Sequence, residues 1–474
     1  MRRHVEVVPT MKSLLFAILL LPFAVSAAGK PNVLFLFADD MRADSIAALG
    51  NPVVKTPNLD SIVQRGFAFK NAFCFGGNSP AVCTPSRNML LSGNAFFRWK
   101  DYQPPAANAG KNPNKKNKGG GAKGMLAPGD APNFPLSMQA AGYETYHHGK
   151  KGNTATLIQA KFQHNKYLLN DAAERKSGEP GQEIADHAVQ FFKERDQSKP
   201  FFMYLAFGNP HDPRVAAQKY LDLYKRDQIP LPKNYRPVHP FNNGEMSIRD
   251  EKLSPWPRTE DEIRRTLHEY YATITAMDHH IGRILAALKE SGQFENTIIL
   301  FSADQGIAVG SHGLLGKQNL YNAGMNAPLF FAGPGIPSGG SDALVYLFDI
   351  YPTVCDLAGA EVPKTIDGIS FKPVIEGKAK TVREEMFLAY MKVQRAVIAD
   401  GYKLIRYPQI NRSQLFDFTN DPEELNDLAD DPAQKDRIAS LLEKMTHWQK
   451  HYTDDLPLTS TNPQPAEWSP PKEK

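Results

Sequence analysis

The residues best suited to chemistry lie in one short segment, residues 83–87, which reads Cys-Thr-Pro-Ser-Arg. Proline and serine at its centre suit the first turn of a helix, so we expect Cys83 at a helix N-terminus. Backbone N–H groups there favour an anion and lower the pKa of a thiol. Arg87 presents a planar fork of donors that matches a tetrahedral oxyanion. The segment predicts a reactive sulfur beside an anion site, although a cysteine at a turn can also be purely structural.

A second group of candidate residues follows two predicted strands, at residues 32–38 and 297–301. Both are continuous apolar runs, which indicates strands buried on both faces of a parallel sheet covered by helices. The side chains that follow them offer hard oxygen ligands: Asp39, Asp40, Asp304 and Gln305. All-oxygen coordination favours Ca²⁺ or Mg²⁺ over Zn²⁺, so we expect a metal site of this kind rather than solvated acidic side chains.

Two more predicted strands also lead to polar residues. The strand at 143–148 is followed by Lys150, and the strand at 201–207 leads to His211. Apolar residues at helical spacing predict the helices between strands: 135–141, 183–195 and 262–291. Alternating helices and buried strands predict an α/β fold, in which ligands lie beyond the carboxyl ends of the strands. We therefore expect these polar residues to converge on one site.

Composition and charge exclude several classes of protein. Of 474 residues, 42% are hydrophobic and 22% charged, which excludes global disorder and fibrous rods. A net charge of +4 is too small for a dedicated nucleic-acid binder. We expect a catalytic domain over residues 28–380. A small C-terminal α+β subdomain is expected over 381–474, with an antiparallel sheet, a helix at 432–451 and a Pro-rich tail.

The N-terminus predicts export. Residues 1–27 combine basic residues, an apolar run and a small-residue cleavage site, which is typical of a secretory signal. The apolar run is shorter than the ~20 residues that span a membrane, although an uncleaved anchor is the alternative. We expect no later membrane span and a secreted or periplasmic protein. The lysine-rich stretch 106–124 predicts either a solvated loop or a basic fringe that attracts a polyanion.

The segment at Cys83 resembles the sulfatase signature Cys-x-Pro-Ser-Arg-x4-Thr-Gly, with Ser92 in place of the usual threonine. Other segments resemble the family in the same order: 39–40, 142–150, 210–214, 303–306, 313–317, 333–336, 415–418 and 421–424. The resemblance is to formylglycine-dependent type I sulfatases. It implies an alkaline-phosphatase-like α/β fold, with a mixed, mostly parallel sheet between helices. It further implies that a formylglycine-generating or anaerobic sulfatase-maturating enzyme oxidises Cys83 to formylglycine (3-oxoalanine), whose hydrated aldehyde is the nucleophile.

The resemblance also implies how a metal is held. It favours Ca²⁺, and it assigns five ligands: Asp39, Asp40, the modified Cys83, Asp304 and Gln305. Gln305 departs from the family, in which Asn or His is more usual at this position. An amide oxygen is still a suitable ligand for Ca²⁺, so we expect this difference to affect geometry more than function.

The remaining roles follow from the same resemblance. Arg87, Lys150 and Lys317 would neutralise the oxygens of the sulfate and the nucleophile. His211 would protonate the leaving oxygen, since imidazole titrates near neutral pH. His312 is expected to line the substrate pocket.

One departure concerns a histidine of the family. The family commonly has Gly-Lys-Trp-His, whose histidine helps the sulfated nucleophile return to the aldehyde, whereas residues 149–152 read Gly-Lys-Lys-Gly. His147 or His148 could substitute, and either could equally be a packing residue.

We therefore expect an exported sulfatase that hydrolyses sulfate monoesters of a sulfated carbohydrate. The alternatives are an arylsulfatase or a phosphomonoester or phosphonate hydrolase of the same superfamily, and a non-catalytic binder of sulfated glycans. Arg395 and Lys403 are expected on the surface. The pairing of Cys74 with Cys355 stays open.

Overall fold

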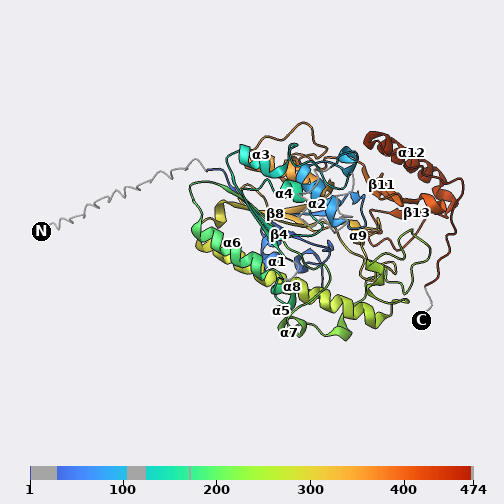
Figure 1. Ribbon diagram of the computed structural model, residues 1–474, viewed down its shortest axis with the longest axis horizontal. Helices are drawn as coiled ribbons and strands as arrows, with labels where there is room; N and C mark the ends of the chain where they lie inside the picture. Colours follow the sequence, from blue (N-terminus) through green and yellow to red (C-terminus); the bar gives the residue numbers. More distant parts are fainter. Residues whose placement is uncertain (2–28, 104–123, 170–171, 471–474) are drawn as a thin grey trace, which may run out of the picture.

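The main body of the computed structural model has three layers (Figure 1), and the structure describes residue 1 and residues 29–103, 124–169 and 172–470. An eight-stranded sheet is the middle layer, and helices cover both of its faces. A five-stranded sheet with α12 (Lys435–Tyr452) stands at one end of the molecule. Apart from Met1, the expected signal sequence lies outside the described residues, as does the part of the lysine-rich stretch before residue 124.

Most of the large sheet is parallel. Its strand order is β5-β4-β6-β1-β7-β8-β2-β9, in which β5 to β7 run parallel and β8 is antiparallel to both neighbours. The bounds are β1 (Asn32–Ala38), β2 (Phe67–Phe73), β4 (Glu144–Lys150), β5 (His164–Leu168), β6 (Phe201–Ala206), β7 (Thr297–Ala303), β8 (Leu329–Ala332) and β9 (Gly339–Tyr346). All residues of β1, β6 and β7 are buried, as their continuous apolar runs predict.

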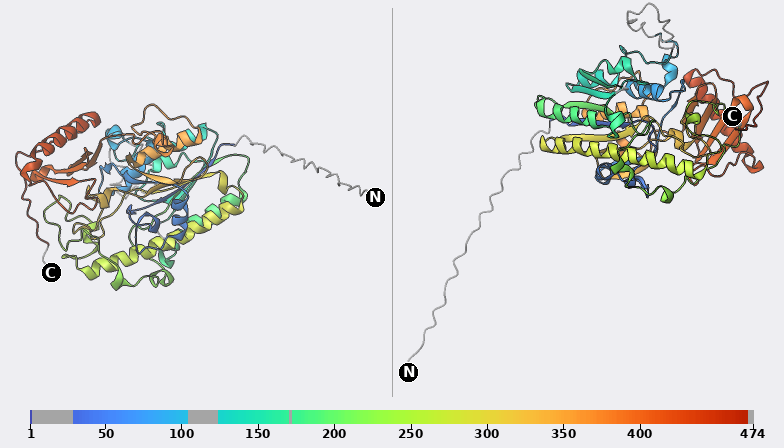
Figure 2. Two further views of the ribbon diagram at one scale, coloured as in Figure 1. Left: turned by 180° about the vertical axis from the view of Figure 1, so that it is seen from behind. Right: turned by 60° about the horizontal axis from the view of Figure 1, so that its bottom comes forward.

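Two groups of helices cover this sheet (Figures 1 and 2). Helices α1 (Pro57–Gln64), α6 (Gln182–Glu194) and α8 (Glu260–Glu290) lie on one face, with the short α5 (Glu174–Ser177) and α7 (Gln218–Leu221). The other face carries α2 (Cys83–Ser92), α3 (Phe134–Ala140), α4 (Thr156–Gln159) and α10 (Ile350–Ala358). The remaining short helices are α9 (Asn322–Met325) and α11 (Lys372–Ile375).

The small sheet draws on two distant parts of the chain. Its order is β13-β12-β11-β10-β3. The bounds are β3 (Gly76–Gly77), β10 (Met386–Tyr390), β11 (Gln394–Ala399), β12 (Tyr402–Tyr407) and β13 (Arg412–Asp417). Gly76 has a φ of 111°, and a Cβ there would lie 2.0 Å from the carbonyl oxygen of Ala389, so only glycine fits this pairing. The strand just before the Cys83 segment is therefore paired with β10 of the small sheet.

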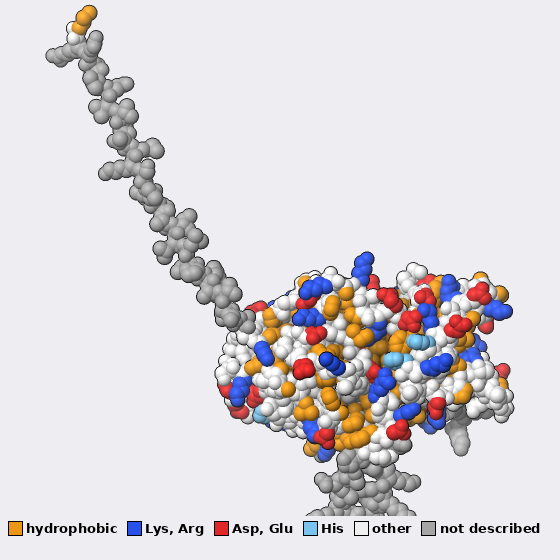
Figure 3. Space-filling model, turned by 90° about the horizontal axis from the view of Figure 1, so that it is seen from above, with side chains coloured by type: hydrophobic (Ala, Val, Ile, Leu, Met, Phe, Trp, Pro, Cys, Tyr) orange, Lys and Arg blue, Asp and Glu red, His pale blue; other side chains and the backbone are white. Residues whose placement is uncertain are grey.

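Several expectations about single residues can be compared with the structure. Cys74, Cys83 and Cys355 are all buried and free, so Cys74 and Cys355 do not form a disulfide. The prediction that Arg395 and Lys403 lie on the surface is wrong, since both are buried in ion pairs. In the described part of the chain, no helix has the length and apolar character needed to cross a membrane. On the face in Figure 3, basic and acidic side chains are interspersed, in keeping with the small net charge.

Candidate active site

Two neighbouring strands bring the predicted oxygen ligands together. β1 and β7 are parallel and in register from Asn32↔Thr297 to Ala38↔Ala303, so the residues that follow them meet at one edge. The backbone N–H of Asp40 donates to Asp304 Oδ1 over 3.0 Å. Asp40 has a φ of 62°, and this left-handed turn ends the extended run directly after β1. The register of two strands thus positions acids that lie far apart in the sequence.

Cys83 lies in the middle of this group. It is the first residue of α2, as predicted, and its side chain is fully buried. Its Sγ is 3.2 Å from Asp39 Oδ1 and 3.7 Å from Asp40 Oδ1. Lys317 Nζ and Gln305 Nε2 approach the same sulfur to 3.3 Å and 3.2 Å. The sulfur therefore faces both acceptors and donors, an environment that suits a polar group better than a packing thiol.

Three buried cations surround these acids. Lys150, at the end of β4, pairs with Asp39. Lys317 Nζ lies 2.7 Å from both carboxylate oxygens of Asp40. Arg87 donates through Nε to Asp304 Oδ2 over 2.9 Å. The structure thus brings together the predicted residues of the Cys83 cluster: Asp39, Asp40, Cys83, Arg87, Lys150, Asp304, Gln305 and Lys317.

The charges of the cluster shift its pKa values in both directions. Burial would raise the pKa of Asp39, but Lys150 and Arg87 outweigh it and hold that pKa well below its usual range. Burial, reinforced by Asp39, raises the pKa of Asp304 to about 7. Burial and the carboxylate of Asp304 also raise the pKa of the Cys83 thiol well above its usual value. The prediction of a lowered thiol pKa is wrong, because it considered the helix terminus and left out the burial among acids.

The cluster has the ligands that a cation needs. Ligand atoms of Asp39, Asp40, Cys83 and Asp304 all lie within 4.8 Å of one another. Gln305 Oε1 is buried and has no hydrogen-bond partner among the described residues. The other end of this amide, Nε2, donates to Asp40 Oδ1 over 2.6 Å, so a half-turn of the amide would direct Oε1 at the carboxylates, where it could ligate a hard cation. The residues present therefore fit the predicted Ca²⁺ site.

A cavity opens onto the cluster. Its volume is about 340 Å³, and Lys317 and His211 line it. His211 lies 3.6 Å from Asp40 Oδ2 through Nε2, and its Nδ1 lies 2.6 Å from the carbonyl oxygen of Asp212. This places one ring nitrogen toward the cluster and leaves the ring 20% exposed, where it can meet a bound molecule.

Other polar residues that line this cavity were not predicted: Asn153, Arg249, Asp250 and Gln318. Gln318 directly follows Lys317, and Asn153 follows the Gly-Lys-Lys-Gly stretch, so nearness to a motif was a usable signal for both. Arg249 and Asp250 belong to a long irregular segment without helical or strand periodicity. No pattern in the sequence identifies them.

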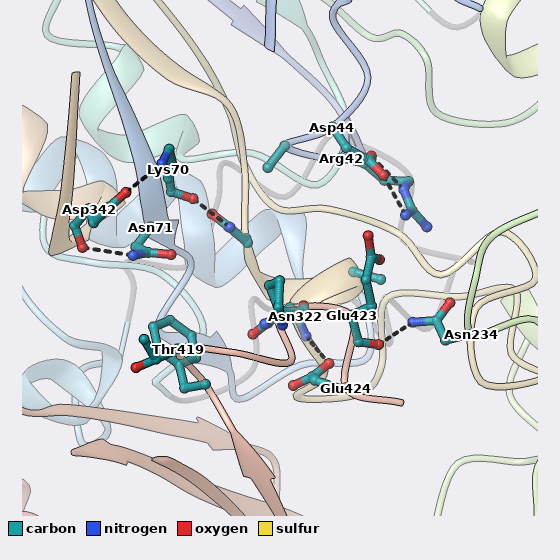
Figure 4. Close-up of a pocket in the computed structure, with 15 residues that line it drawn as sticks. Arg42, Asp44, Lys70, Asn71, Asn234, Asn322, Asp342, Thr419, Glu423 and Glu424 are labelled. Atoms are coloured by element: carbon teal, nitrogen blue, oxygen red, sulfur yellow. Dashed lines mark hydrogen bonds and ion pairs between the residues drawn. The ribbon is translucent and has the colours of Figure 1, made fainter. Parts of the chain in front are cut away.

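His312 is not part of the Cys83 cluster. It stacks on Tyr321 with ring centroids 3.8 Å apart, and its Nε2 lies 3.1 Å from Asn234 and 3.7 Å from Glu424. Asn234 and Glu424 line a different cavity of about 480 Å³, drawn in Figure 4. Polar groups around that cavity pair with one another: Lys70 with Asp342, and the backbone N–H of Asn322 with the carboxylate of Glu424. The structure therefore places His312 beside a second cavity.

The two histidines that could replace the missing family histidine point to opposite faces of β4. His147 hydrogen-bonds with Asn165 over 2.8 Å and packs against Phe162 and Tyr204. His148 lies against His187 of α6, with ring centroids 4.9 Å apart. None of the contacts between described residues joins either ring to Cys83. Both lie away from the nucleophile.

Comparison with known proteins identifies the family of the chain. The family model for sulfatases matches residues 31–360, and the model for the C-terminal region of N-sulphoglucosamine sulphohydrolase matches residues 310–451. An arylsulfatase of Clostridium perfringens is 27% identical over 495 residues, which cover 92% of this chain and 98% of that protein. An N-acetylglucosamine-6-O-sulfatase of Bacteroides thetaiotaomicron is 26% identical over 512 residues, covering 90% and 88%.

The fold is also found among solved structures. A protein solved in complex with its substrate D-glucosamine-2-N,6-O-disulfate aligns with a TM-score of 0.71 at 24% identity, covering 90% of this chain and 99% of that one. The layered sheet and these likenesses define an enzyme of the alkaline-phosphatase-like fold. Within it, the chain belongs to the sulfatase family and is a sulfuric ester hydrolase.

Proposed function

We propose that the protein is an exported sulfatase that removes sulfate from a sulfated carbohydrate, with Cys83 matured to formylglycine and Ca²⁺ in the adjacent acidic site. The observation that carries the proposal is the Cys83 cluster, in which one buried sulfur contacts the carboxylates of Asp39 and Asp40 and the ammonium of Lys317. Lys317 in turn lines a cavity. The sulfur stands where the hydrated aldehyde of formylglycine would have its oxygens. The donors and acceptors around it suit two hydroxyl groups.

The protein residues have the task of stabilising negative charge. A sulfate ester is an anion, and its transition state gathers charge on the bridging oxygen, so preorganised cations supply much of the catalysis. Lys317 reaches both Asp40 and the Cys83 sulfur, and can therefore hold an oxygen of the nucleophile or of the sulfate. Arg87 and Lys150 complete the positive lining. The metal, when bound, adds positive charge at the sulfate oxygens.

His211 is assigned to the leaving group. It lines the cavity from the side of Asp40, and imidazole can donate a proton near neutral pH. The carbonyl oxygen of Asp212, close to Nδ1, favours a proton on that nitrogen and fixes the ring orientation. In the imidazolium form Nε2 carries a second proton and faces the site. It can hand that proton to the departing alcohol, which leaves a neutral ring with its remaining proton on Nδ1.

A carbohydrate fits the rest of the cavity. Its polar lining includes Asn153, Arg249, Asp250 and Gln318, which can donate to or accept from sugar hydroxyls. One relative is named an N-acetylglucosamine-6-O-sulfatase, and one similar structure holds D-glucosamine-2-N,6-O-disulfate as its substrate, which supports a sulfated amino sugar as the first class to test. The signal-like N-terminus agrees with a substrate met outside the cytoplasm.

The test is a desulfation screen on the protein produced together with a sulfatase-maturating enzyme. Release of free sulfate is measured on sulfated monosaccharides and oligosaccharides, on 4-nitrophenyl sulfate and on 4-nitrophenyl phosphate. We expect the fastest turnover on a sulfated saccharide and much slower turnover on the phosphate. Faster release from the phosphate overturns the sulfatase assignment, and equal rates on all sulfates overturn the carbohydrate assignment.

Maturation and metal are tested separately. In intact-mass analysis, the peptide with residue 83 should have lost one sulfur and two hydrogens and gained one oxygen relative to cysteine. Dialysis against a chelator should abolish sulfate release, and Ca²⁺ should restore it. An unmodified thiol in active protein contradicts the formylglycine proposal.

A further inference from the structure

A second group of metal-ligating side chains lies between α6 and β4, outside the Cys83 cluster. Along this interface Tyr146 packs on Phe191 at 4.7 Å and His148 on His187 at 4.9 Å between ring centroids. Two residues of a strand advance about as far as four residues of a helix, roughly 6 to 7 Å. The two ring pairs therefore follow one another along the interface between α6 and β4. Glu183 lies one helical turn before His187 and continues the same row.

The three side chains converge. Ligand atoms of His148, Glu183 and His187 all lie within 4.8 Å of one another. His148 Nε2 is 3.8 Å from Glu183 Oε1, which is too long for a hydrogen bond. The carboxylate and imidazole therefore face one another without satisfying each other directly, and the space between them is of the size that a bound ion requires.

Unpartnered nitrogens provide an independent observation. Nδ1 of His148 and Nδ1 of His187 are buried, and neither has a hydrogen-bond partner in the described part of the chain. The side chain of His148 is only 1% exposed. Leaving a buried polar atom without a partner is costly, so the unpartnered nitrogens of these two neighbouring rings indicate that a ligand outside the protein chain completes them.

The surroundings allow a cation to enter and stay. Burial of the His148 ring keeps bulk water from competing for its nitrogens. Glu183 keeps 39% of its side chain exposed, which gives an ion access from solvent. Lys166 stands opposite His148 on β5, but it is exposed and free to direct its ammonium into water.

We propose that His148, Glu183 and His187 form a second metal site, which binds a divalent transition-metal ion with the ligand preference of Zn²⁺. Two imidazole nitrogens and one carboxylate oxygen suit Zn²⁺ and its neighbours, whereas Ca²⁺ prefers oxygen ligands alone. Three protein ligands leave one position for water. The ion ties α6 to β4, whose last residue is Lys150 of the Cys83 cluster.

The experiment is a Zn²⁺ titration of the whole purified protein, followed by calorimetry, with Ca²⁺ present in excess to fill the oxygen-rich site. We expect one equivalent of Zn²⁺ to bind. Glu183→Gln and His187→Ala should weaken binding by at least about 100-fold, since loss of a direct ligand exceeds the 10–100-fold typical of an outer partner. The matched control His164→Ala removes an exposed histidine of β5 that pairs with Glu144, and should bind as the natural chain does.

X-ray absorption of the Zn²⁺-loaded protein identifies the ligands. We expect scattering from two imidazoles, with nitrogen and oxygen at about 2.0–2.2 Å. A sulfur at about 2.3 Å would place the ion at Cys83 and overturn the proposal. Zn²⁺ binding that survives both Glu183→Gln and His187→Ala overturns it as well, as does the absence of binding. Glu183 is partly exposed, so Glu183→Gln is a safe test of the site even if the histidine variants fold poorly.

Discussion

The molecule buries ionised side chains in several regions, and two of these regions differ in what they leave unsatisfied. In the C-terminal subdomain, Lys403 Nζ lies 2.7 Å from Glu424, and Arg395 makes two hydrogen bonds to Asp454 of 2.7 and 2.8 Å. The third donor group of Arg395, Nη1, is taken up by backbone carbonyls, including that of Met391. Each of these buried cations has an acidic partner inside the protein, and we call such ion pairs closed.

The Cys83 cluster is built of the same residue types but is not closed. Arg87 Nη1 and Gln305 Oε1 are buried without a hydrogen-bond partner among the described residues, although charged groups surround them. The cluster also faces a cavity, through Lys317. Buried ion pairs alone are thus weak evidence for a site, whereas buried ion pairs with orphaned polar atoms and an opening indicate that a ligand completes them.

Removing the nucleophile should separate chemistry from stability most sharply. Cys83→Ala should lower kcat by at least about 10⁴-fold, because no other group can form the covalent bond, and should change the unfolding free energy little. Sulfate release and denaturant unfolding measure the two effects. Cys355→Ala, a buried cysteine outside the cluster, is the control and should keep full kcat. Substantial activity in Cys83→Ala would contradict the assignment.

Breaking one of the buried ion pairs outside the Cys83 cluster should lower the stability of the protein and leave its catalysis intact. Lys403→Met leaves the Glu424 carboxylate buried and unpaired, which should cost about 3–5 kcal/mol of unfolding free energy. Below its melting temperature the variant should keep its kcat. The control Lys378→Met removes a lysine that is 72% exposed and pairs with Glu376, so it should stay within about 0.5 kcal/mol of the natural chain. Equal stability of the two variants would show that the buried pair is not structural.

The role of His211 depends on the leaving group. His211→Gln should lower kcat/KM by about 10²–10⁴-fold on an alkyl or sugar sulfate, whose alkoxide needs a proton. On 4-nitrophenyl sulfate the loss should be much smaller, since nitrophenolate leaves without one. The ratio of the two losses is the measurement. An equal loss on both substrates would assign His211 to binding instead of proton donation.

Substitution of Lys317 tests how much the positive charge in the Cys83 cluster contributes to catalysis. Lys317→Met should lower kcat by about 10²–10³-fold, the effect expected for one preorganised stabiliser of a developing oxyanion. Lys151→Met is a matched control, because Lys151 directly follows Lys150 but is exposed. Steady-state kinetics on a sulfated saccharide distinguishes the two. If both variants lose activity equally, general charge rather than the position of Lys317 is responsible.

Another buried acid, Asp278 of α8, should show its effect through the pH dependence of stability. It accepts hydrogen bonds from the backbone N–H groups of Asn58 and Leu59, and burial raises its pKa to about 6. Since the folded protein holds this proton more tightly than the unfolded chain, Asp278 stabilises most at low pH, and that contribution is lost as the pH rises through about 6. The stability of the natural chain relative to Asp278→Asn should therefore fall by up to about 3 kcal/mol between pH 4 and 7. Urea unfolding at several pH values measures it, and a constant difference would contradict the raised pKa.

Much of the fold follows from short-range pattern. The apolar run after Pro31 predicts β1 to the residue, and the helical stripe predicted over 262–291 is α8 within two residues at each end. Six strands among the described residues were not predicted, β2, β3, β5, β8, β9 and β13, which lie at or near the edges of their sheets. Their burial is partial or their runs are short, so the continuous apolar signal is weak.

The residues of the Cys83 cluster, in contrast, could be predicted from residue types at strand ends and from one motif. Asp39, Asp40, Cys83, Arg87, Asp304 and Lys317 could be named from the sequence because each stands directly after a strand or within a recognisable segment. The distances between these side chains could not be predicted from the sequence. His312 lies in such a segment as well, yet it stacks on Tyr321 beside another cavity.

The sequence by itself determined which side chains are available and which faces of each strand and helix are apolar, because these depend on order and period along the chain. Only the tertiary structure decided that β6, β1 and β7 are neighbours, that Asp39 and Asp304 therefore meet, and that His148 faces Glu183 and His187. The physical reason is that strand pairing and helix packing are chosen by the free energy of the whole core. A local pattern shows that a surface must be buried, but not which distant segment buries it.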